Sequence, residues 1–212
     1  MSRFQLQSSA SGLRLADTQS RQHPLQIDFA SGQFSYRLRK GGGKQELLAK
    51  AVGVKQGLSV LDCTAGLGRD SFLLASMGCS ITMLERSRVM VLLLKDALRR
   101  SENHVDLKAS VDRIRLIHTD AIGYLNQLEH VPDVIMLDPM FPTRKKSAHV
   151  KGEMQVLQRF LGSDGDIENL FTVALATSCK RLVVKRPVSE KSELSPTFSL
   201  KGNSTRFDVF VR

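Results

Sequence analysis

The sequence has few cysteines and no long hydrophobic run, and both absences narrow the class of protein. Its longest apolar stretch, residues 89–94, is far shorter than the roughly 18 residues that a membrane-spanning helix needs. The first thirty residues are polar and lack the hydrophobic segment of a signal peptide. Cys63, Cys79 and Cys179 share no C-x-x-C or Cys/His ligand spacing, which argues against a zinc site and against a disulfide framework. We therefore expect a soluble, cytoplasmic protein with no metal centre and no membrane partner.

Acidic residues are missing from two segments that are rich in lysine and arginine. The chain has 31 Lys and Arg against 21 Asp and Glu, a formal net charge of +10. The segments 37–44 and 144–151 hold no acid, and their basic residues are Arg37, Arg39, Lys40, Lys44, Arg144, Lys145, Lys146 and Lys151. Clustered positive charge suits a polyanion, so we expect these residues to bind the phosphates of a nucleic acid. An ordinary basic surface is the alternative that composition leaves open.

The amino-terminal segment has a pattern of its own. Residues 25–29 and 34–38 alternate apolar and polar side chains around Ser31-Gly32, which predicts a β-hairpin. Three glycines at 41–43 interrupt the pattern. A chain of 212 residues can form one main domain with a small appendage. We therefore predict a β-hairpin subdomain with a glycine linker over residues 1–43 and a main domain over residues 44–212.

Beyond the glycines, short apolar runs alternate with stretches of helical periodicity. Strands are predicted at 58–62, 80–85, 113–118, 133–138, 181–186 and 206–211. Helices are predicted at 44–52, 69–77, 88–100, 122–129, 153–160 and 167–178. Residues 189–204, rich in Ser, Lys and Pro, are predicted to form a loop. This order predicts an α/β fold with a mostly parallel, doubly wound sheet.

Acidic residues follow four successive predicted strands. Asp62, Glu85 and Asp138 end their strands, and Asp120 lies just past the third. Ligands of an open parallel sheet bind beyond the carboxyl ends of its strands. A single acid there could equally cap a helix or face solvent. Four at matching positions predict a ligand site.

A glycine loop follows the first acid in the stretch "DCTAGLGRDS". Gly66 and Gly68 allow a close backbone approach to a ligand at the turn into a helix. Ser71 stands where a dinucleotide motif has its third glycine, and Asp62 would repel a pyrophosphate. S-adenosylmethionine, which carries positive charge and no phosphate, fits this loop better. Arg69 is a candidate partner for its carboxylate, or simply part of the first helical turn.

Two further strand ends supply candidate contacts for the nucleoside part of this cofactor. Glu85 lies nineteen residues after Gly66, where an acid accepts hydrogen bonds from both ribose hydroxyls. An acid at this position serves NAD and S-adenosylmethionine equally. Asp120-Ala121 offers a carboxylate for the adenine amino group and a backbone N–H for its ring.

The fourth strand ends in a corner, Asp138-Pro139-Met140-Phe141. Asp138 can accept hydrogen bonds from an exocyclic amine, Pro139 restricts the backbone, and Phe141 can stack on a base. These features favour methyl transfer to an amine. A proline-stiffened turn with a core phenylalanine is the structural alternative.

These residues resemble those of the Rossmann-like, class I S-adenosylmethionine-dependent methyltransferases, and "DPMF" is similar to their [DN]-P-P-[FY] motif. More of the chain resembles the bacterial RsmJ family, which methylates guanine N2 in 16S ribosomal RNA. The similar blocks, in order, are "RKGGGKQELLAKAVGV", "DCTAGLGRDSFLLASMGC", "MLERS", "LDPMFPTRKKSAHVKGEM", "VVKRP" and "RFDVFV". The resemblance implies cofactor contacts at Arg69-Asp70, Glu85-Arg86, Asp120-Ala121 and Asp138. It also implies 16S rRNA or the small ribosomal subunit as the partner.

Two alternatives stay open beside an S-adenosylmethionine-dependent rRNA methyltransferase. An NAD-dependent oxidoreductase could use the same sheet, but the chain shows no obvious acid or base for hydride transfer. A non-catalytic RNA-binding protein would need the basic segments and leave the four acids unexplained.

Overall fold

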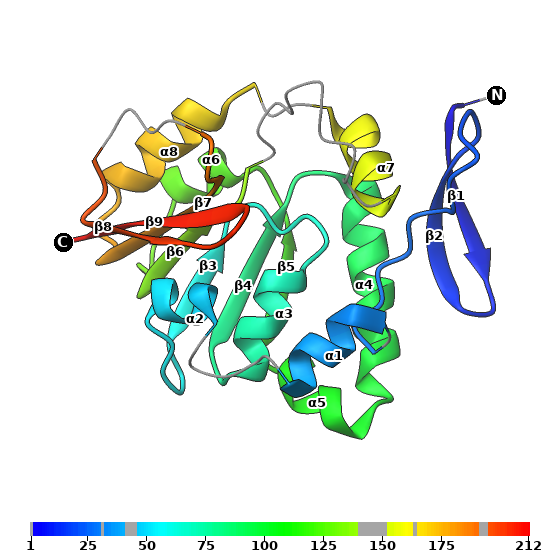
Figure 1. Cartoon of the computed structure of the whole chain (residues 1–212), viewed down its shortest axis with the longest axis horizontal. Coiled ribbons are helices and arrows are strands. Elements are labelled where there is room, and N and C mark those ends of the chain that lie inside the picture. The colour runs from blue at the N-terminus through cyan, green and yellow to red at the C-terminus, as the bar shows by residue number, and fades with distance from the viewer. Residues whose placement is uncertain (1, 31, 41–45, 140–151, 163–164, 191–194) are drawn as a thin grey trace.

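A seven-stranded sheet forms the centre of the protein in the computed structural model, which describes residues 2–30, 32–40, 46–139, 152–162, 165–190 and 195–212 (Figure 1). Its strand order is β5-β4-β3-β6-β7-β9-β8. Its strands are β3 (Ser59–Asp62), β4 (Ser80–Glu85), β5 (Ile114–His118), β6 (Val134–Leu137), β7 (Arg181–Pro187), β8 (Phe198–Lys201) and β9 (Thr205–Val211). Neighbours from β5 to β7 pair in parallel, and β9 pairs antiparallel with β7 and β8. The prediction of a mostly parallel α/β sheet is confirmed.

The sheet reverses its direction of growth between β3 and β6. The chain adds β4 and β5 on one side of β3, then returns to add β6 and β7 on the other. Such a switch point opens a crevice at the carboxyl ends of the two central strands. Asp62 ends β3 and Asp138 follows β6, so both acids lie at this crevice.

Helices cover both faces of the sheet because successive strand residues point to opposite sides. Val60 and Leu61 of β3 illustrate this, since they belong to separate buried clusters. One cluster contains side chains of α2 (Leu47–Val52), α3 (Arg69–Ser76), α4 (Arg88–Glu102), α5 (Val105–Val111) and α7 (Gly152–Leu161). The other contains side chains of α6 (Ala121–Asn126) and α8 (Ile167–Ala176). No helix in the described ranges is long and apolar enough to cross a membrane.

The predicted strands and helices of the main domain agree with the structure to within a few residues. The predicted loop 189–204 is wrong at its end, where β8 forms an edge strand beside β9. α5 was not predicted at all. Both elements bury few apolar side chains, since α5 buries only Ser110 and Val111 and β8 buries none fully. Hydrophobic periodicity therefore carries little signal for them.

The amino-terminal hairpin exists, but it is formed by other residues than those predicted. It consists of β1 (Phe4–Ser9) and β2 (Gly12–Asp17), while residues 32–40 form the helix α1 (Gly32–Lys40). Phe34 packs on Phe72 with its ring centroid 6.0 Å away, and Tyr36 is exposed. Over five residues, alternation and helical spacing are hard to separate, because Phe34 and Leu38 fit both.

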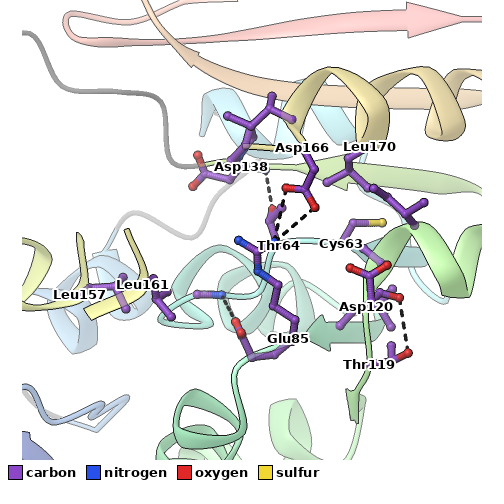
Figure 2. Close-up of a pocket in the computed structure, with 17 residues that line it drawn as sticks. Cys63, Thr64, Glu85, Thr119, Asp120, Asp138, Leu157, Leu161, Asp166 and Leu170 are labelled. Carbon is purple, nitrogen blue, oxygen red and sulfur yellow. Dashed lines mark hydrogen bonds and ion pairs between the residues drawn. The ribbon is translucent and has the colours of Figure 1, made fainter. Parts of the chain in front are cut away.

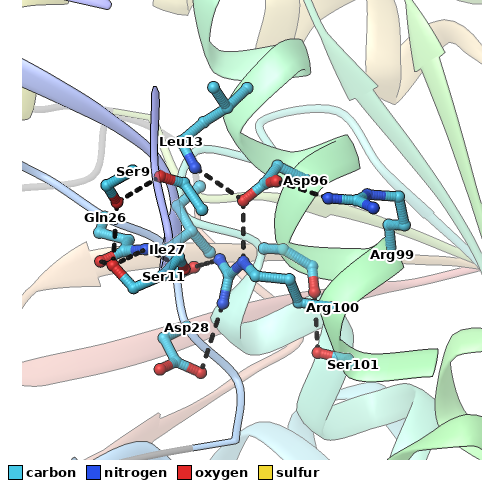
Figure 3. A network of polar contacts seen from close by, with 12 residues as sticks. Ser9, Ser11, Leu13, Gln26, Ile27, Asp28, Asp96, Arg99, Arg100 and Ser101 are labelled. Carbon is cyan, nitrogen blue, oxygen red and sulfur yellow. Dashed lines mark hydrogen bonds and ion pairs between the residues drawn. The ribbon is translucent and has the colours of Figure 1, made fainter. Parts of the chain in front are cut away.

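The hairpin is bound to α4 through a buried carboxylate (Figure 3). Asp96 Oδ2 accepts hydrogen bonds from the Leu13 backbone N–H at 3.0 Å and from Arg100 Nε at 2.8 Å. The same arginine donates to the carbonyl of Ile27. Gly12 lies against this pair with φ of 114°, where a larger residue would be strained. The hairpin is thus held by side chains far along the sequence.

A second set of contacts joins the hairpin to α7. The rings of Phe4 and Phe160 meet edge to face at 5.2 Å, and Arg159 lies 3.4 Å from Asp17. In Figure 1 the hairpin accordingly lies at the periphery, beside α4 and α7. Residues of the segment after the hairpin, such as Phe29, belong to the main buried cluster. The boundary at residue 43 stays a prediction.

Candidate active site

The glycine loop after β3 turns the chain sharply into α3. Gly66 and Gly68 have φ of 53° and 69°, in the left-handed region that glycine adopts without strain. A Cβ at Gly68 would lie 2.8 Å from Leu94 Cδ2 and 3.3 Å from the Phe29 ring. The loop therefore needs glycine for its backbone conformation and for its close packing.

Asp62 anchors this loop from below. It is 2% exposed, and its Oδ1 accepts from the Thr64 backbone N–H at 3.0 Å while Oδ2 accepts from Ser71 Oγ at 2.6 Å. Burial raises the pKa of Asp62 to about 6, although both hydrogen bonds favour the ionised form. Ser71 thus has a structural reason to replace the third glycine. The predicted contact between Asp62 and the cofactor stays a prediction.

Glu85 lies at the end of β4 and is held by two backbone groups. Its Oε1 accepts from the Ser87 N–H at 2.7 Å, and its Oε2 accepts from the Gly66 N–H at 3.3 Å. The neighbouring Arg86 forms a half-exposed ion pair with Asp166, N to O 3.3 Å. The structure therefore places Glu85 and the glycine loop against one another, and the predicted contact of Glu85 with the ribose hydroxyls stays a prediction.

Asp120 and Ala121 lie where β5 passes into α6. Asp120 caps this helix, with its Oδ1 accepting from the Gly123 N–H at 2.9 Å. The capping role accounts for part of the side chain's hydrogen-bonding capacity. The same residues also line the pocket described next, so the cap and the predicted adenine contact are compatible.

A pocket runs along the strand ends from Glu85 and Asp120 to Asp138 (Figure 2). Its apolar walls come from Cys63, Leu84 and Ile122 and from helices α7 and α8, which contribute Leu157, Leu161, Ile167 and Leu170. Few polar groups set in an apolar cleft are typical of small-molecule sites. Sequence reasoning missed this wall and Asp166, because ordinary core periodicity gave no sign that their helices would close over the strand ends.

A second pocket adjoins the first and shares Thr64, Gly66, Asp138, Pro139 and Leu157 with it. Asp138 therefore lies at the junction of the two. Its backbone N–H donates to Thr64 Oγ1 at 2.6 Å. The second pocket also includes the side chains of Asp62, Arg69, Asp70 and Lys185.

Lys185 of β7 is the residue that sequence reasoning missed at this junction. Its Nζ lies 2.7 Å from Asp138 Oδ2 and 2.7 Å from Asp70 Oδ2. Arg37 of α1 reaches Asp70 at 3.5 Å and pairs with Glu46 at 2.9 Å. Burial opposes ionisation of Asp70, but Lys185 and Arg37 outweigh it and hold the pKa of that carboxyl below its usual value. The only signal in the sequence was the block "VVKRP", which identified the lysine without its role.

The structure thus brings the predicted acids, the glycine loop and Asp70 together at one edge of the sheet. Arg37 was predicted to bind RNA, but here it joins two carboxylates. Arg39 and Lys40 belong to α1, and their side chains lie outside the described part of the structure. The other predicted residues outside the described ranges are Lys44, Met140, Phe141, Arg144, Lys145, Lys146 and Lys151. Within the described ranges, no group of three His, Cys, Asp or Glu side chains could hold a metal ion.

A doubly wound sheet with this loop and these acids defines a class, the S-adenosylmethionine-dependent methyltransferases. The family model described as "Putative SAM-dependent methyltransferase" matches residues 1–212. A crystal structure of a SAM-dependent methyltransferase from Neisseria gonorrhoeae superposes with a TM-score of 0.77 at 31% identity, covering 97% of this chain and 81% of that one. The cofactor is therefore S-adenosylmethionine.

Curated relatives narrow the class further. The chain is 45% identical over 191 residues to ribosomal RNA small subunit methyltransferase J of Shewanella loihica, covering 88% of this chain and 74% of that protein. It is 46% identical over 193 residues to the protein of the same name in Tolumonas auensis, covering 89% and 78%. The chain belongs to the ribosomal RNA small subunit methyltransferase J family. This membership does not favour an NAD-dependent oxidoreductase or a non-catalytic RNA-binding protein.

Proposed function

We propose that the protein transfers a methyl group from S-adenosylmethionine to the exocyclic N2 amine of a guanosine in 16S ribosomal RNA, in the cytoplasm. The observation that carries this proposal is the place of Asp138, at the junction of two adjoining pockets. The first pocket suits the nucleoside part of the cofactor, and the second offers room for its methionine part and for an acceptor base. The names of the relatives support ribosomal RNA of the small subunit as the substrate.

The residues present fit the cofactor. Glu85 offers a buried carboxylate to a diol at the end of β4. Asp120 and Ala121 offer polar groups beside apolar walls that suit an adenine ring, and Arg69 can pair with a carboxylate in the second pocket. The four acids suit a cofactor that carries positive charge and no phosphate. When bound, S-adenosylmethionine supplies an electrophilic methyl group on a sulfonium.

Asp138 would act on the acceptor amine. Its carboxylate accepts a hydrogen bond from the amine N–H, which draws the nitrogen lone pair out of conjugation with the base and orients it. Transfer would form the new N–C bond as the methyl–sulfonium bond of the cofactor breaks, so S-adenosylhomocysteine would leave, and Asp138 or water would take the proton released by the amine nitrogen. Pro139 restricts the backbone beside this carboxylate, and we assign Phe141 to stacking on the base.

Positive charge beyond the corner would hold the RNA. We assign phosphate contacts to the segment 144–151 and to Arg39, Lys40 and Lys44, while Arg37 serves the carboxylates of the site. Such contacts provide affinity without sequence choice. Selectivity then comes from a base that leaves the RNA fold and enters the second pocket. The partner is 16S rRNA or the assembled small subunit.

Product analysis tests the proposed function directly. Small subunits and free 16S rRNA from a strain that lacks the gene are incubated with the protein and a labelled methyl donor. We expect the label in N2-methylguanosine after digestion and mass spectrometry of the nucleosides. Label in another nucleoside, or in ribosomal protein only, would refute the assignment. Comparing the two substrates shows which one is methylated.

The salt dependence of RNA binding tests the basic segment 144–151. A Lys145→Ala/Lys146→Ala double variant should lower the slope of log K against log salt by about one to two units, because fewer counterions are released. An unchanged slope would remove this segment from the RNA interface.

A further inference from the structure

Five charged side chains form a continuous row that ends at Asp138. The row runs from Glu46 to Arg37 at 2.9 Å, from Arg37 to Asp70 at 3.5 Å, and from Asp70 through Lys185 to Asp138 at 2.7 Å each. It joins α1, the start of α3, β7 and the corner after β6. Acidic and basic groups alternate along it. Lys185 is the sole basic side chain that touches Asp138 among the described residues.

The position of Lys185 follows from the sheet. Val184 of β7 lies beside Leu137 of β6, so the next residues along these parallel strands are Lys185 and Asp138. Val183 is buried on the α3 side of the sheet, and Lys185, two residues later, points to the same side. Asp70, in the first turn of α3, meets it there. The lysine is therefore placed by two rigid elements.

We infer that Lys185 is a positioning residue for the methyl transfer: it holds one oxygen of Asp138 so that the other faces the acceptor amine as an ionised acceptor. This inference rests on the proposed function of Asp138. Lys185 Nζ donates a hydrogen bond to Asp138 Oδ2, and the backbone N–H of Asp138 donates to Thr64 Oγ1. Oδ1 has no hydrogen-bond partner among the described residues, and the side chain is 38% exposed into the pockets it lines.

Removing the lysine would affect Asp138 more than Asp70. Asp70 keeps Arg37 as a second cation, whereas Asp138 would face Asp70 with no cation in contact among the described residues. A nearby carboxylate disfavours ionisation of its neighbour, and an opposite charge favours it. The side chains of Lys185 and Asp138 are 26% and 38% exposed, so solvent screens this pair only in part. Loss of Lys185 should therefore leave Asp138 protonated to a higher pH.

Two variants separate charge from packing. Lys185→Met keeps an unbranched chain of similar length without the ammonium, and Lys185→Arg keeps the cation. With saturating donor and RNA, we expect single-turnover methylation by Lys185→Met to fall about 10–100-fold at pH 7.5. The acid limb of its pH–rate profile should move up by about one unit or more. Lys185→Arg should restore part of the rate and return the acid limb toward its original position.

Arg37→Met is the matched control for the acid limb. It removes the other cation of the row, which touches Asp70 and not Asp138. Its acid limb should therefore move less than that of Lys185→Met. A shift as large in Arg37→Met would mean that the lysine acts only as one of several charges in the row, and would overturn the specific role.

A titration without substrate separates this inference from the proposed function. Protein labelled with ¹³C at the aspartate carboxyl carbon is titrated by NMR, and the Asp138 signal is assigned from its absence in Asp138→Asn. We expect the apparent pKa of Asp138 to rise in Lys185→Met while thermal unfolding stays cooperative. An unmoved Asp138 titration overturns the inference whatever the enzyme methylates. Wild-type protein that methylates no 16S rRNA refutes the proposed function instead.

Discussion

Asp96 and Asp138 each join segments that are far apart in the sequence, but they are bound in different ways. Asp96 is 7% exposed. Its carboxylate accepts a hydrogen bond from the backbone N–H of Leu13, 83 residues away, and forms ion pairs with Arg99 and Arg100. Asp138 is 38% exposed, and one of its carboxylate oxygens accepts a hydrogen bond from Lys185, 47 residues away. Both oxygens of the Asp96 carboxylate therefore bind groups of the chain itself. The Asp138 carboxylate keeps an oxygen toward a pocket.

Asp96 thus has a structural role, because it joins two parts of the chain. Asp138 keeps an oxygen that can bind a ligand. A buried acid with all its hydrogen bonds made stabilises one arrangement of the chain, here the hairpin on α4. An acid with one oxygen available contributes less to the stability of the folded protein, but it can bind a ligand. Four variants test this distinction.

Asp138→Ala should have the largest effect, and on turnover. Losing the orientation and electrostatic contribution of this carboxylate should raise the barrier by about 3–5 kcal/mol, a rate loss of about 10²–10⁴. The fold should persist, because Lys185 keeps Asp70 as a partner. Single-turnover methylation with saturating donor measures the rate, and thermal unfolding checks the fold. A folded variant with near wild-type rate would reduce the corner to a turn.

Asp96→Ala should act on stability. It leaves the Leu13 N–H and the Nε–H of Arg100 without their acceptor, which should cost about 2–3 kcal/mol of unfolding free energy. Urea denaturation measures the loss. Arg99→Ala is the control, because that side chain is 75% exposed and its removal should change stability by less than about 0.5 kcal/mol. Equal losses in the two variants would contradict a special role for the buried acid.

Glu85→Ala should act on cofactor binding. We expect S-adenosylhomocysteine, the demethylated cofactor, to bind about 1.5–3 kcal/mol more weakly, because two charge-assisted hydrogen bonds are lost. Isothermal titration calorimetry measures this, and NADH should give no binding heat with either protein. Glu168→Ala on α8 is the control, since it is an exposed acid that does not line the pocket. Unchanged affinity in Glu85→Ala would remove this acid from the cofactor site.

Asp62 tests an acid that lies in the site but is satisfied like Asp96. Its pKa is raised from 3.8 to about 6 in the folded protein, so its contribution favours folding at low pH and is lost as pH rises through about 6. Between pH 5 and 7.5 this loss should be about 1–1.5 kcal/mol. Asp62→Asn should remove the dependence. Urea denaturation of both proteins at these two pH values measures the effect. An equal change in unfolding free energy between the two pH values in wild type and in Asp62→Asn would contradict the expectation.

The strand ends could be predicted from the sequence, because each is a local pattern. A short apolar run followed by an acid and a turn, as at Leu84-Glu85 or Leu137-Asp138, is readable without knowing its neighbours. The glycine loop is equally local, since left-handed φ values at Gly66 and Gly68 suit no other residue as well. The topology rule for parallel sheets then placed the acids at one edge.

The contacts that complete the site were beyond such reasoning. Lys185 meets Asp70 across 115 residues, and Leu157 of α7 closes over strand ends that precede it in the chain. A lysine in a strand and a leucine in a helix are ordinary in sequence terms. The hairpin was misplaced for a related reason, because the residues that bind it, Asp96 and Arg100, belong to another element.

The sequence by itself determined the α/β class, the four strand-end acids and the glycine loop, because these depend on periodicity and backbone conformation within a few residues. Only the tertiary structure decided which acid keeps an oxygen available and which acid has both oxygens hydrogen-bonded within the protein. That outcome depends on the partner that packing brings within about 3 Å, the distance over which hydrogen bonds act. Asp62 and Asp138 look alike in the sequence, but Ser71 and Thr64 occupy both oxygens of one, while Lys185 takes a single oxygen of the other.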